Sequence, residues 1–202
     1  MKTEKPETSS EKMNRKKGAF MKKLIAIAAV TILTFTACDQ ANTCDYDASA
    51  NTLSCSEKTY KTSNLGGKIW MAENMAVYIP DSSVCYGNDH VNCEIMGRLY
   101  TWNAATTGLC PKGWTLPSRQ DFKNAFGNTS TAALKESASF KMQFAGFRYY
   151  DGKFADKDES ASFWTSDSYD GSRAYLVRAT DSTITYEHFN KNIFASVRCV
   201  KE

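Results

Sequence analysis

Cysteine is the residue type whose number and spacing promise the most chemistry in this chain. Seven cysteines occur, at positions 38, 44, 55, 85, 93, 110 and 199. If Cys38 carries a lipid, as argued below, six remain, and an even number is typical of a disulfide framework in an exported protein. Six thiols can pair in many ways, but closure of the shortest loops favours two local pairs and leaves the last two for each other. The expected pairs are Cys44 with Cys55, Cys85 with Cys93, and Cys110 with Cys199.

Metal-binding and catalytic sets are the next chemistry to consider. The chain has no Cys-x-x-Cys pair, and its two histidines, His90 and His188, are isolated, so neither a metal site nor a cofactor is expected. No segment is typical of a nucleophile elbow or of a phosphate-binding glycine loop. Acidic pairs such as Asp156 and Asp158 belong to a polar turn. We therefore expect no catalytic residues and a protein that is not an enzyme.

Aromatic side chains could still bind a ligand through their flat apolar faces. Four tyrosines lie on or beside the strands expected in the C-terminal half, and they form the candidate ligand face: Tyr149, Tyr150, Tyr169 and Tyr175. Tyrosine is also common in half-buried strands. Plain packing is therefore the alternative, and the more frequent one.

The start of the chain carries a different kind of chemistry. Lys22 and Lys23 precede an uncharged run over residues 24–37. As a helix this run would reach roughly 21 Å, less than the ~30 Å of a hydrocarbon core. A charged start before a short apolar stretch is typical of a secretory signal. The letters FTAC at 35–38 resemble the bacterial lipobox, which predicts cleavage before Cys38 and lipid attachment to it. Ordinary cleavage that leaves a thiol at Cys38 is the alternative.

The leader also carries most of the positive charge. Residues 1–37 hold eight of the 25 basic and three of the 22 acidic residues, so residues 38–202 are slightly acidic. A nucleic-acid partner is therefore not expected. We expect a leader and signal peptide over 1–37, a lipid anchor and short tether over 38–45, and one folded domain over 46–202. Residues 1–20 are either a long charged start or precede a true start at Met21. The expected location is the cell envelope, with the lipid chains held in a bacterial membrane (the outer membrane or the cell surface).

Two helices are expected in the first half of the folded domain. Apolar residues at helical spacing over 95–106 predict the first, which Gly108 would end. Ser118, with Asp121 three residues later, predicts the N-terminus of the second, and Gly127 would stop it. Its expected buried residues are Phe122, Ala125 and Phe126.

Hairpins are expected on both sides of the helices. Paired turn residues predict tight turns at 66–67, 151–152 and 170–171, and another turn is expected near Asn190. After the first turn, Trp70 is the expected core residue and Met71 should lie on the opposite face. The order of hairpin, two helices and antiparallel strands predicts an α+β domain stapled by disulfides.

Five segments together carry a resemblance to a known family. They are "KIWMAENM", "CYGNDHVNCEIMGRLYTWNAA", "CPKGWTLPS", "FWTSD" and "SVRCV". In this order they resemble the Fibrobacter succinogenes major paralogous domain, over residues 46–201. Members are typically exported proteins or lipoproteins, and the general function of the family is not established.

The same stretch is distantly similar to the C-type lectin-like fold. In that fold a cysteine after the first helix bonds the last strand, which implies a bond between Cys110 and Cys199. The resemblance also implies sugar binding, but the calcium-binding triplets of calcium-dependent lectins are not carried over. The nearest segments are Ile79-Pro80-Asp81 and Trp164-Thr165-Ser166-Asp167.

The expected function is therefore a lipid-anchored envelope protein with a non-enzymatic binding or adhesion module for a glycan or a protein. One alternative is an enzyme of the formylglycine-generating type, which shares the lectin-like fold and needs free cysteines. The other is a purely structural envelope protein.

Overall fold

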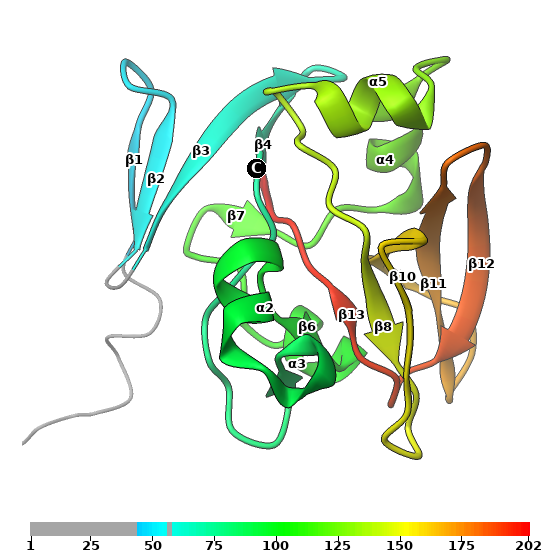
Figure 1. Cartoon of the computed structure of the whole chain (residues 1–202). Helices are drawn as coiled ribbons and strands as arrows, with labels where there is room; N and C mark the ends of the chain where they lie inside the picture. Colours follow the sequence, from blue (N-terminus) through cyan, green and yellow to red (C-terminus); the bar gives the residue numbers. More distant parts are fainter. Residues whose placement is uncertain (1–43, 56–57) are drawn as a thin grey trace, which may run out of the picture. The chain divides into compact units, whose positions relative to one another are not determined.

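Two β-sheets with short helices between their strands make up the part of the chain that the structure describes (Figure 1). The structure is a computed structural model, and it describes residues 44–55 and 58–202. These residues belong to one compact unit, Cys38–Glu202. The expected leader, the lipidation residue Cys38 and most of the expected tether lie outside the described residues.

The first sheet is a meander whose far edge is completed by the end of the chain. β1 to β4 pair antiparallel in sequence order, followed by β14 and then β7. The expected hairpin at 66–67 is confirmed. Gly66 has a φ of +59°, and a Cβ there would lie 2.5 Å from the backbone of Asn124, so only glycine fits this turn. The strands are β1 Cys44–Asp47, β2 Thr52–Cys55, β3 Lys58–Leu65, β4 Lys68–Met71, β7 Trp114–Thr115 and β14 Val200–Lys201.

The second sheet has the order β12-β11-β10-β13-β6-β5, with β8 paired to β10 and β9 paired to β8. The expected turns at 151–152 and 170–171 join β8 to β9 and β10 to β11, and both hairpins are confirmed. β13 and β8 instead run parallel to β10. The strands are β5 Ser83–Val84, β6 Leu99–Tyr100, β8 Ala145–Arg148, β9 Phe154–Lys157, β10 Ser160–Ser168, β11 Arg173–Thr180, β12 Ile184–Asn190 and β13 Ala195–Ser196.

Four short α-helices occupy the connections within the described residues, where two were expected. They are α2 His90–Met96, α3 Trp102–Thr106, α4 Arg119–Phe126 and α5 Thr131–Glu136, with the short 3₁₀ turn η2 Tyr86–Asn88 ahead of α2. The described chain is therefore mostly β-sheet. This agrees with an α+β domain stapled by disulfides at the coarse level, and the C-type lectin-like relation stays a prediction.

The expected helix over 95–106 is wrong. α2 ends at Met96 because Gly97 has a φ of +75°, and a Cβ there would lie 2.7 Å from Asn74. Leu99–Tyr100 then form β6, which pairs with β13 and β5. Ile95, one of the apolar residues of that expected helix, is 63% exposed. The apolar spacing that predicted one helix comes from two short helices with a strand between them.

The second expected helix is confirmed as α4. The Ser118 hydroxyl accepts a hydrogen bond from the backbone N–H of Asp121, and the Asp121 carboxylate accepts one from the backbone N–H of Ser118. Each partner thereby satisfies an N–H group that the helix leaves unpaired. Phe122 and Phe126 are buried, and the helix ends at Gly127 with a φ of +51°.

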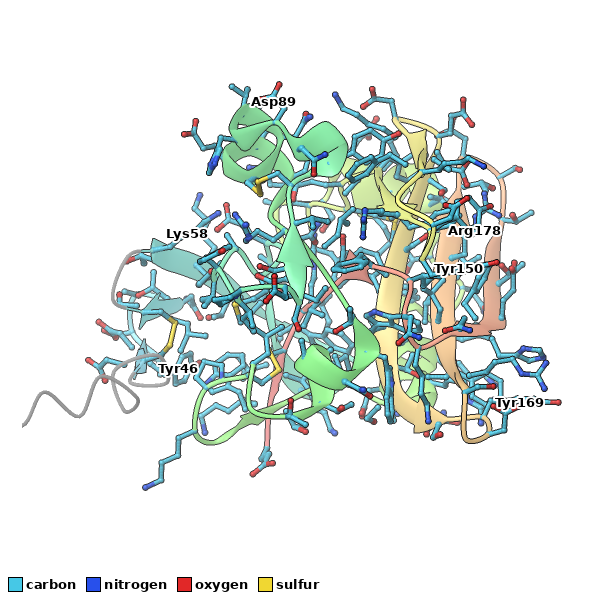
Figure 2. All side chains as sticks on the ribbon, turned by 90° about the horizontal axis from the view of Figure 1, so that it is seen from below. Tyr46, Lys58, Asp89, Tyr150, Tyr169 and Arg178 are labelled. Carbon is cyan, nitrogen blue, oxygen red and sulfur yellow. A yellow bond between two sulfur atoms is a disulfide. The ribbon has the colours of Figure 1, made fainter. Side chains whose placement is uncertain are left out.

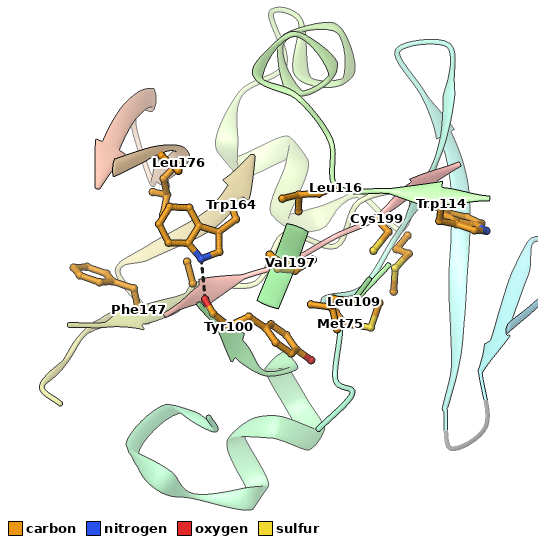
Figure 3. Packing of buried hydrophobic residues seen from close by; sticks show 14 of the residues in the cluster. Met75, Tyr100, Leu109, Trp114, Leu116, Phe147, Trp164, Leu176, Val197 and Cys199 are labelled. Carbon is orange, nitrogen blue, oxygen red and sulfur yellow. Dashed lines mark hydrogen bonds between the residues drawn. The ribbon is translucent and has the colours of Figure 1, made fainter. Parts of the chain in front are cut away.

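β4 separates two hydrophobic clusters. Trp70 is fully buried in one cluster, as expected, together with aromatic residues of α4 and β10. Met71, on the opposite face of the strand, is equally buried in the other cluster. Figure 3 shows this second cluster, in which Trp164 donates its indole N–H to the carbonyl oxygen of Tyr100 (2.8 Å). The sheet is therefore covered on both sides.

The structure contains the same three disulfides that the sequence predicted: Cys44 with Cys55, Cys85 with Cys93, and Cys110 with Cys199. The last joins residues 89 apart in sequence and ties the loop before β7 to the end of the chain. β12 ends at Asn190, where a turn was expected. Cys199 itself directly precedes β14 rather than lying on a strand.

Candidate functional site

The four tyrosines predicted as a ligand face do not share one face. Tyr149 packs against Phe147, which packs against Phe189 of β12. Tyr175 of β11 instead lies opposite His188, the residue before Phe189. Because neighbouring residues of a strand point to opposite faces, Tyr175 and the Phe189 ring that Tyr149 reaches through Phe147 lie on opposite sides of the β11–β12 ribbon. The prediction of a single four-tyrosine face is therefore wrong.

Each half of that predicted face has its own surroundings. Tyr169 stacks on His188 at 4.0 Å between ring centroids and meets Tyr175 edge-on at 5.4 Å. The guanidinium of Arg119 lies 3.5 Å from the centroid of Tyr175, and it also pairs with Asp167. Tyr150 is 70% exposed at the β8–β9 turn. Figure 2 shows Tyr150 and Tyr169 as separate exposed side chains. Tyr169, Tyr175, His188 and Arg119 therefore pack against one another rather than around an open ligand site.

A groove of about 360 Å³ lies beside α3 and β7. Its apolar lining includes Trp102 of α3, Trp114 of β7 and Leu116. Its lining also includes three hydroxyl-bearing residues from three different segments, which are Thr106, Thr115 and Ser166. None of the residues that line the groove has an ionisable side chain, because its cysteine, Cys110, is in a disulfide. The exposed part of the groove therefore consists mainly of the Trp102 ring and hydroxyl-bearing residues, because Trp114 is only 6% exposed. The lining carries no formal charge.

Local hydrogen bonding fixes the position of Trp102 in this groove. Thr101 caps α3 and places Trp102 at its first position. The indole N–H of Trp102 donates to the carbonyl oxygen of Thr165 on β10 (2.8 Å). The ammonium of Lys191 lies 4.4 Å from the ring centroid and donates to the carbonyl oxygen of Asp170 (2.8 Å). The indole ring of Trp102 is therefore fixed by a hydrogen bond at its N–H edge and lies next to the Lys191 ammonium.

The opposite wall depends on the disulfide between Cys110 and Cys199. Pro111 and Gly113 form the turn that leads to Trp114. The backbone N–H of Trp114 donates to the carbonyl oxygen of Pro111 (2.8 Å). Trp114 then pairs with Lys201 of β14, only two residues beyond Cys199. The sulfur bridge and this strand pairing hold the same loop at two points. This wall is accordingly one of the more constrained loops of the fold.

The shifted pKa values lie away from the groove. Burial raises the pKa of Tyr60 to about 12, and it also raises the pKa of Tyr100 well above its usual value. The Tyr60 hydroxyl accepts from the N–H of Ala76, and the Tyr100 hydroxyl donates to the carbonyl oxygen of Val77. Both groups are thus core hydroxyls that bind backbone, and neither is poised for proton transfer near neutral pH.

Other predicted features can also be placed. Trp164, the start of the segment nearest a lectin calcium triplet, is fully buried in the core. Residues 44–55 and 58–202 contain no cluster of three or more histidine, cysteine or acidic side chains arranged to hold a metal ion. None of the helices in the same residues has the length and apolar character needed to span a membrane.

Sequence reasoning did not identify the groove. Trp102 was counted only among the residues of the helix expected over 95–106, and no ligand was assigned to Trp114. Ser166, which comes from β10, reaches the groove because its N–H donates to the carbonyl oxygen of Pro117 (2.9 Å). The one available signal was the pair of tryptophans on either side of the glycine- and proline-containing loop around Cys110.

Comparison with known proteins gives one family. A family model described as the Fibrobacter succinogenes major domain matches residues 64–133. This range contains the first three of the five segments that carried the resemblance, and it is narrower than the expected 46–201. It also contains both tryptophans of the groove. No curated protein and no solved structure matches the chain.

Proposed function

This chain belongs to the family of the Fibrobacter succinogenes major domain, and from that premise we propose that it is an exported, lipid-anchored cell-envelope protein whose folded domain binds a ligand. The domain acts as a binding or adhesion module and not as an enzyme. The groove between α3 and β7 is the ligand site, and its ligand is a neutral glycan.

The anchor is supported by the sequence ahead of the folded domain. A charged start, an uncharged run over 24–37 and the letters FTAC at 35–38 are typical of a lipoprotein signal. The cysteines add a second argument. All six beyond Cys38 are paired in disulfides, a pattern typical of oxidising compartments outside the cytoplasm. Cys38 is then the one cysteine left for lipid.

The lining of the groove is the single observation that carries the choice of ligand. A sugar ring has apolar C–H faces and hydroxyl edges, and it binds by stacking on aromatic rings and by hydrogen bonds. Trp102, the more exposed of the two tryptophans in the lining, supplies the ring, and Thr115 and Ser166 supply hydroxyls. The Thr106 hydroxyl donates to carbonyl oxygens of its own helix and is left to accept. A lining without formal charge favours a neutral sugar over a charged one.

The paired cysteines also favour binding over the formylglycine-generating alternative. That chemistry needs free cysteines, and Cys110, the cysteine at the groove, is bonded to Cys199. A protein ligand is the other candidate occupant. The two kinds of ligand differ in the area that they would cover. A sugar fills the groove, whereas a protein also covers the residues around the groove.

Glycan binding can be tested with the full-length protein extracted in detergent. We expect it to bind at least one neutral polysaccharide from a panel that includes cellulose and xylan. Ser166→Arg places a long charged side chain on the exposed rim of the groove. It should weaken binding at least tenfold, about 1.4 kcal/mol.

Tyr150→Ala is the matched control, because it removes an exposed aromatic ring outside the groove. Its binding should equal that of the unaltered protein. Equal binding by Ser166→Arg would contradict the groove as the site, and failure to bind any neutral polysaccharide would contradict the glycan.

The anchor needs a separate measurement, which is the intact mass of the membrane-extracted protein with and without reduction. We expect a chain that begins at Cys38, carries acyl groups and gains six hydrogen atoms when its three disulfides are reduced. A chain that begins upstream of Cys38, or an unmodified Cys38, would contradict lipid anchoring.

A further inference from the structure

Arg98 is a buried arginine whose neighbours are sulfur atoms. Its side chain is only 9% exposed. Nη1 lies 3.4 Å from the sulfur of Cys85 and 3.3 Å from the sulfur of Cys93, while Nε donates to the Ser83 hydroxyl (3.1 Å). The guanidinium also lies 4.8 Å from the ring centroid of Tyr78. Figure 2 shows the yellow sulfur bond beside the helix that follows Asp89.

A comparison with Arg198 shows what is unusual here. Arg198 is fully buried and donates to four oxygen atoms, from Asn74, Ala72, Phe140 and Lys141. The Nη1 group of Arg98 instead donates to two sulfur atoms, which are weak hydrogen-bond acceptors. Within residues 44–55 and 58–202, no ion pair includes Arg98. A cation without a carboxylate therefore faces a neutral disulfide.

We propose that the bond between Cys85 and Cys93 is a site of thiol–disulfide exchange, which Arg98 makes the most readily reduced of the three disulfides. The electrostatic interaction between the guanidinium and the disulfide is weak, because the disulfide is neutral. The interaction with a thiolate at the same position is much stronger. Selective stabilisation of the reduced form raises the reduction potential of a disulfide.

The reaction partner is a dithiol, either small or on a protein. Its thiolate attacks one of the two sulfurs, the bond between Cys85 and Cys93 breaks, and its electron pair leaves on the other sulfur as a thiolate that Arg98 holds. The second thiol of the partner, as thiolate, then attacks the mixed disulfide and releases the first cysteine. Two electrons have moved to the cysteines, and the partner has become a disulfide.

The bond between Cys44 and Cys55 is a natural control in the same molecule. It joins residues 11 apart, against 8 for Cys85 and Cys93, so the chain entropy of the two closures is similar. The bond between Cys110 and Cys199 spans 89 residues and should be the hardest to reduce. The two short loops also differ in burial, because Cys85 and Cys93 are 5% and 7% exposed whereas Cys44 and Cys55 are half-buried. The effect of the arginine contact is therefore isolated by changing Arg98 alone.

The first test needs no variant. The full-length protein is equilibrated with mixtures of reduced and oxidised dithiothreitol, alkylated, and digested with trypsin. Cys85 and Cys93 leave together in the peptide 69–98, which contains no other cysteine. We expect this pair to have an equilibrium constant for reduction at least tenfold larger than that of Cys44 and Cys55, about 30 mV. Equal constants would overturn the proposal.

The second test changes the cation. Arg98→Met should make the pair Cys85 and Cys93 at least tenfold harder to reduce, Arg98→Lys should retain most of the difference, and Cys44 and Cys55 should not change in either variant. A pair that stays equally reducible in Arg98→Met would overturn the role of the charge. If Arg98→Met loses its near-ultraviolet circular dichroism and is unfolded, the comparison of disulfides in the unaltered protein, together with Arg98→Lys, decides the outcome.

Discussion

The two faces of β4 look onto clusters built in different ways. On the Trp70 side, aromatic rings meet mostly edge to face, with centroids 4.9 to 6.0 Å apart. The members of this ring cluster are Trp70, Phe122, Phe126, Phe140 and Phe163. Arg198 closes it, with its guanidinium 4.0 Å from the centroid of Phe140. None of the residues that line the groove belongs to this ring cluster.

On the Met71 side, aliphatic and sulfur-containing residues pack among aromatic ones such as Tyr100 and Trp164. Met71, Met75, Leu109, Leu116, Val197 and Cys199 belong to this groove-side cluster. Leu116 and Trp114 are members of the cluster and also line the groove. The hydrophobic core on this side therefore continues into a surface that a ligand can reach.

The difference between the two clusters indicates that they have different roles. Interlocking aromatic rings tolerate little change in volume, so the ring cluster should set stability. The groove-side cluster is closed at its edge by a disulfide and by hydroxyl-bearing loops, so it should set binding. Changes on the two sides are therefore expected to separate stability from affinity.

The largest effect is expected for Phe140→Ala in the ring cluster. Phe140 is fully buried, contacts Trp70, Phe126 and Phe163, and lies against Arg198. Its removal leaves a cavity that the other rings cannot fill, which should lower the free energy of unfolding by about 3–5 kcal/mol. Urea denaturation measures this change. Glycan affinity of the molecules that remain folded should be unaltered, and a parallel loss of affinity would show that the two sides are coupled.

The double variant Cys110→Ser, Cys199→Ser should act on both properties. The closure of a loop of 89 residues is lost, which should lower the free energy of unfolding by about 2–5 kcal/mol. The groove wall at Trp114 should also loosen, so glycan affinity should fall as well. Cys85→Ser, Cys93→Ser is the control, because these cysteines neither line the groove nor belong to the groove-side cluster, so affinity should stay unchanged. Unchanged affinity in the first variant would separate the bridge from the site.

Asp121→Asn tests the N-terminal cap of α4, the helix that positions Phe122. Although burial raises the pKa of Asp121, its hydrogen bonds with Lys68 and Ser118 together hold that pKa below the usual 3.8. The variant should lose about 1 kcal/mol of unfolding free energy at neutral pH, as a weakened cap does. A lowered folded-state pKa gives stability that is present above pH 3.8 and is lost as the pH falls through the lower folded value. The difference between the two proteins should therefore shrink in acid, and a constant difference would contradict this cause.

Local signals explain which parts of the fold could be predicted. The hairpin at 66–67, the capping box of α4 and the glycine at its end each depend on a few adjacent residues. The disulfide pairing followed from an even count and short loops. The helix over 95–106 failed because the same apolar spacing suits two short helices and a strand, and only the positive φ of Gly97 decides between them. α5, six residues long, was too short to give a clear period.

The candidate site depended on contacts that sequence alone does not show. The four tyrosines were grouped by nearness in sequence, whereas the register of β11 on β12 places Tyr175 on the face opposite Phe189, the ring that Tyr149 reaches through Phe147. The groove needs β10 beside the loop that contains Pro117, so that Ser166 lies near Trp102. Neither the pairing of β10 nor that approach has a local signal, although the disulfide at Cys110 pointed to the correct loop.

The smallest effect is expected for Lys191→Met, and it decides whether charge matters at the groove. The Lys191 ammonium lies beside the Trp102 ring and bonds backbone carbonyl oxygens of the β10–β11 turn. Its loss should lower the free energy of unfolding by about 0.5 kcal/mol, typical of an exposed cation–π contact. Methionine keeps the apolar stem over the ring, and Lys191→Arg, which keeps the charge, is the control. Because the groove lining is uncharged, affinity for a neutral glycan should stay within about twofold in both variants, a difference of about 0.4 kcal/mol. A tenfold loss in Lys191→Met alone, measured by titration calorimetry, would mean that the ligand carries negative charge and that Lys191 binds it directly.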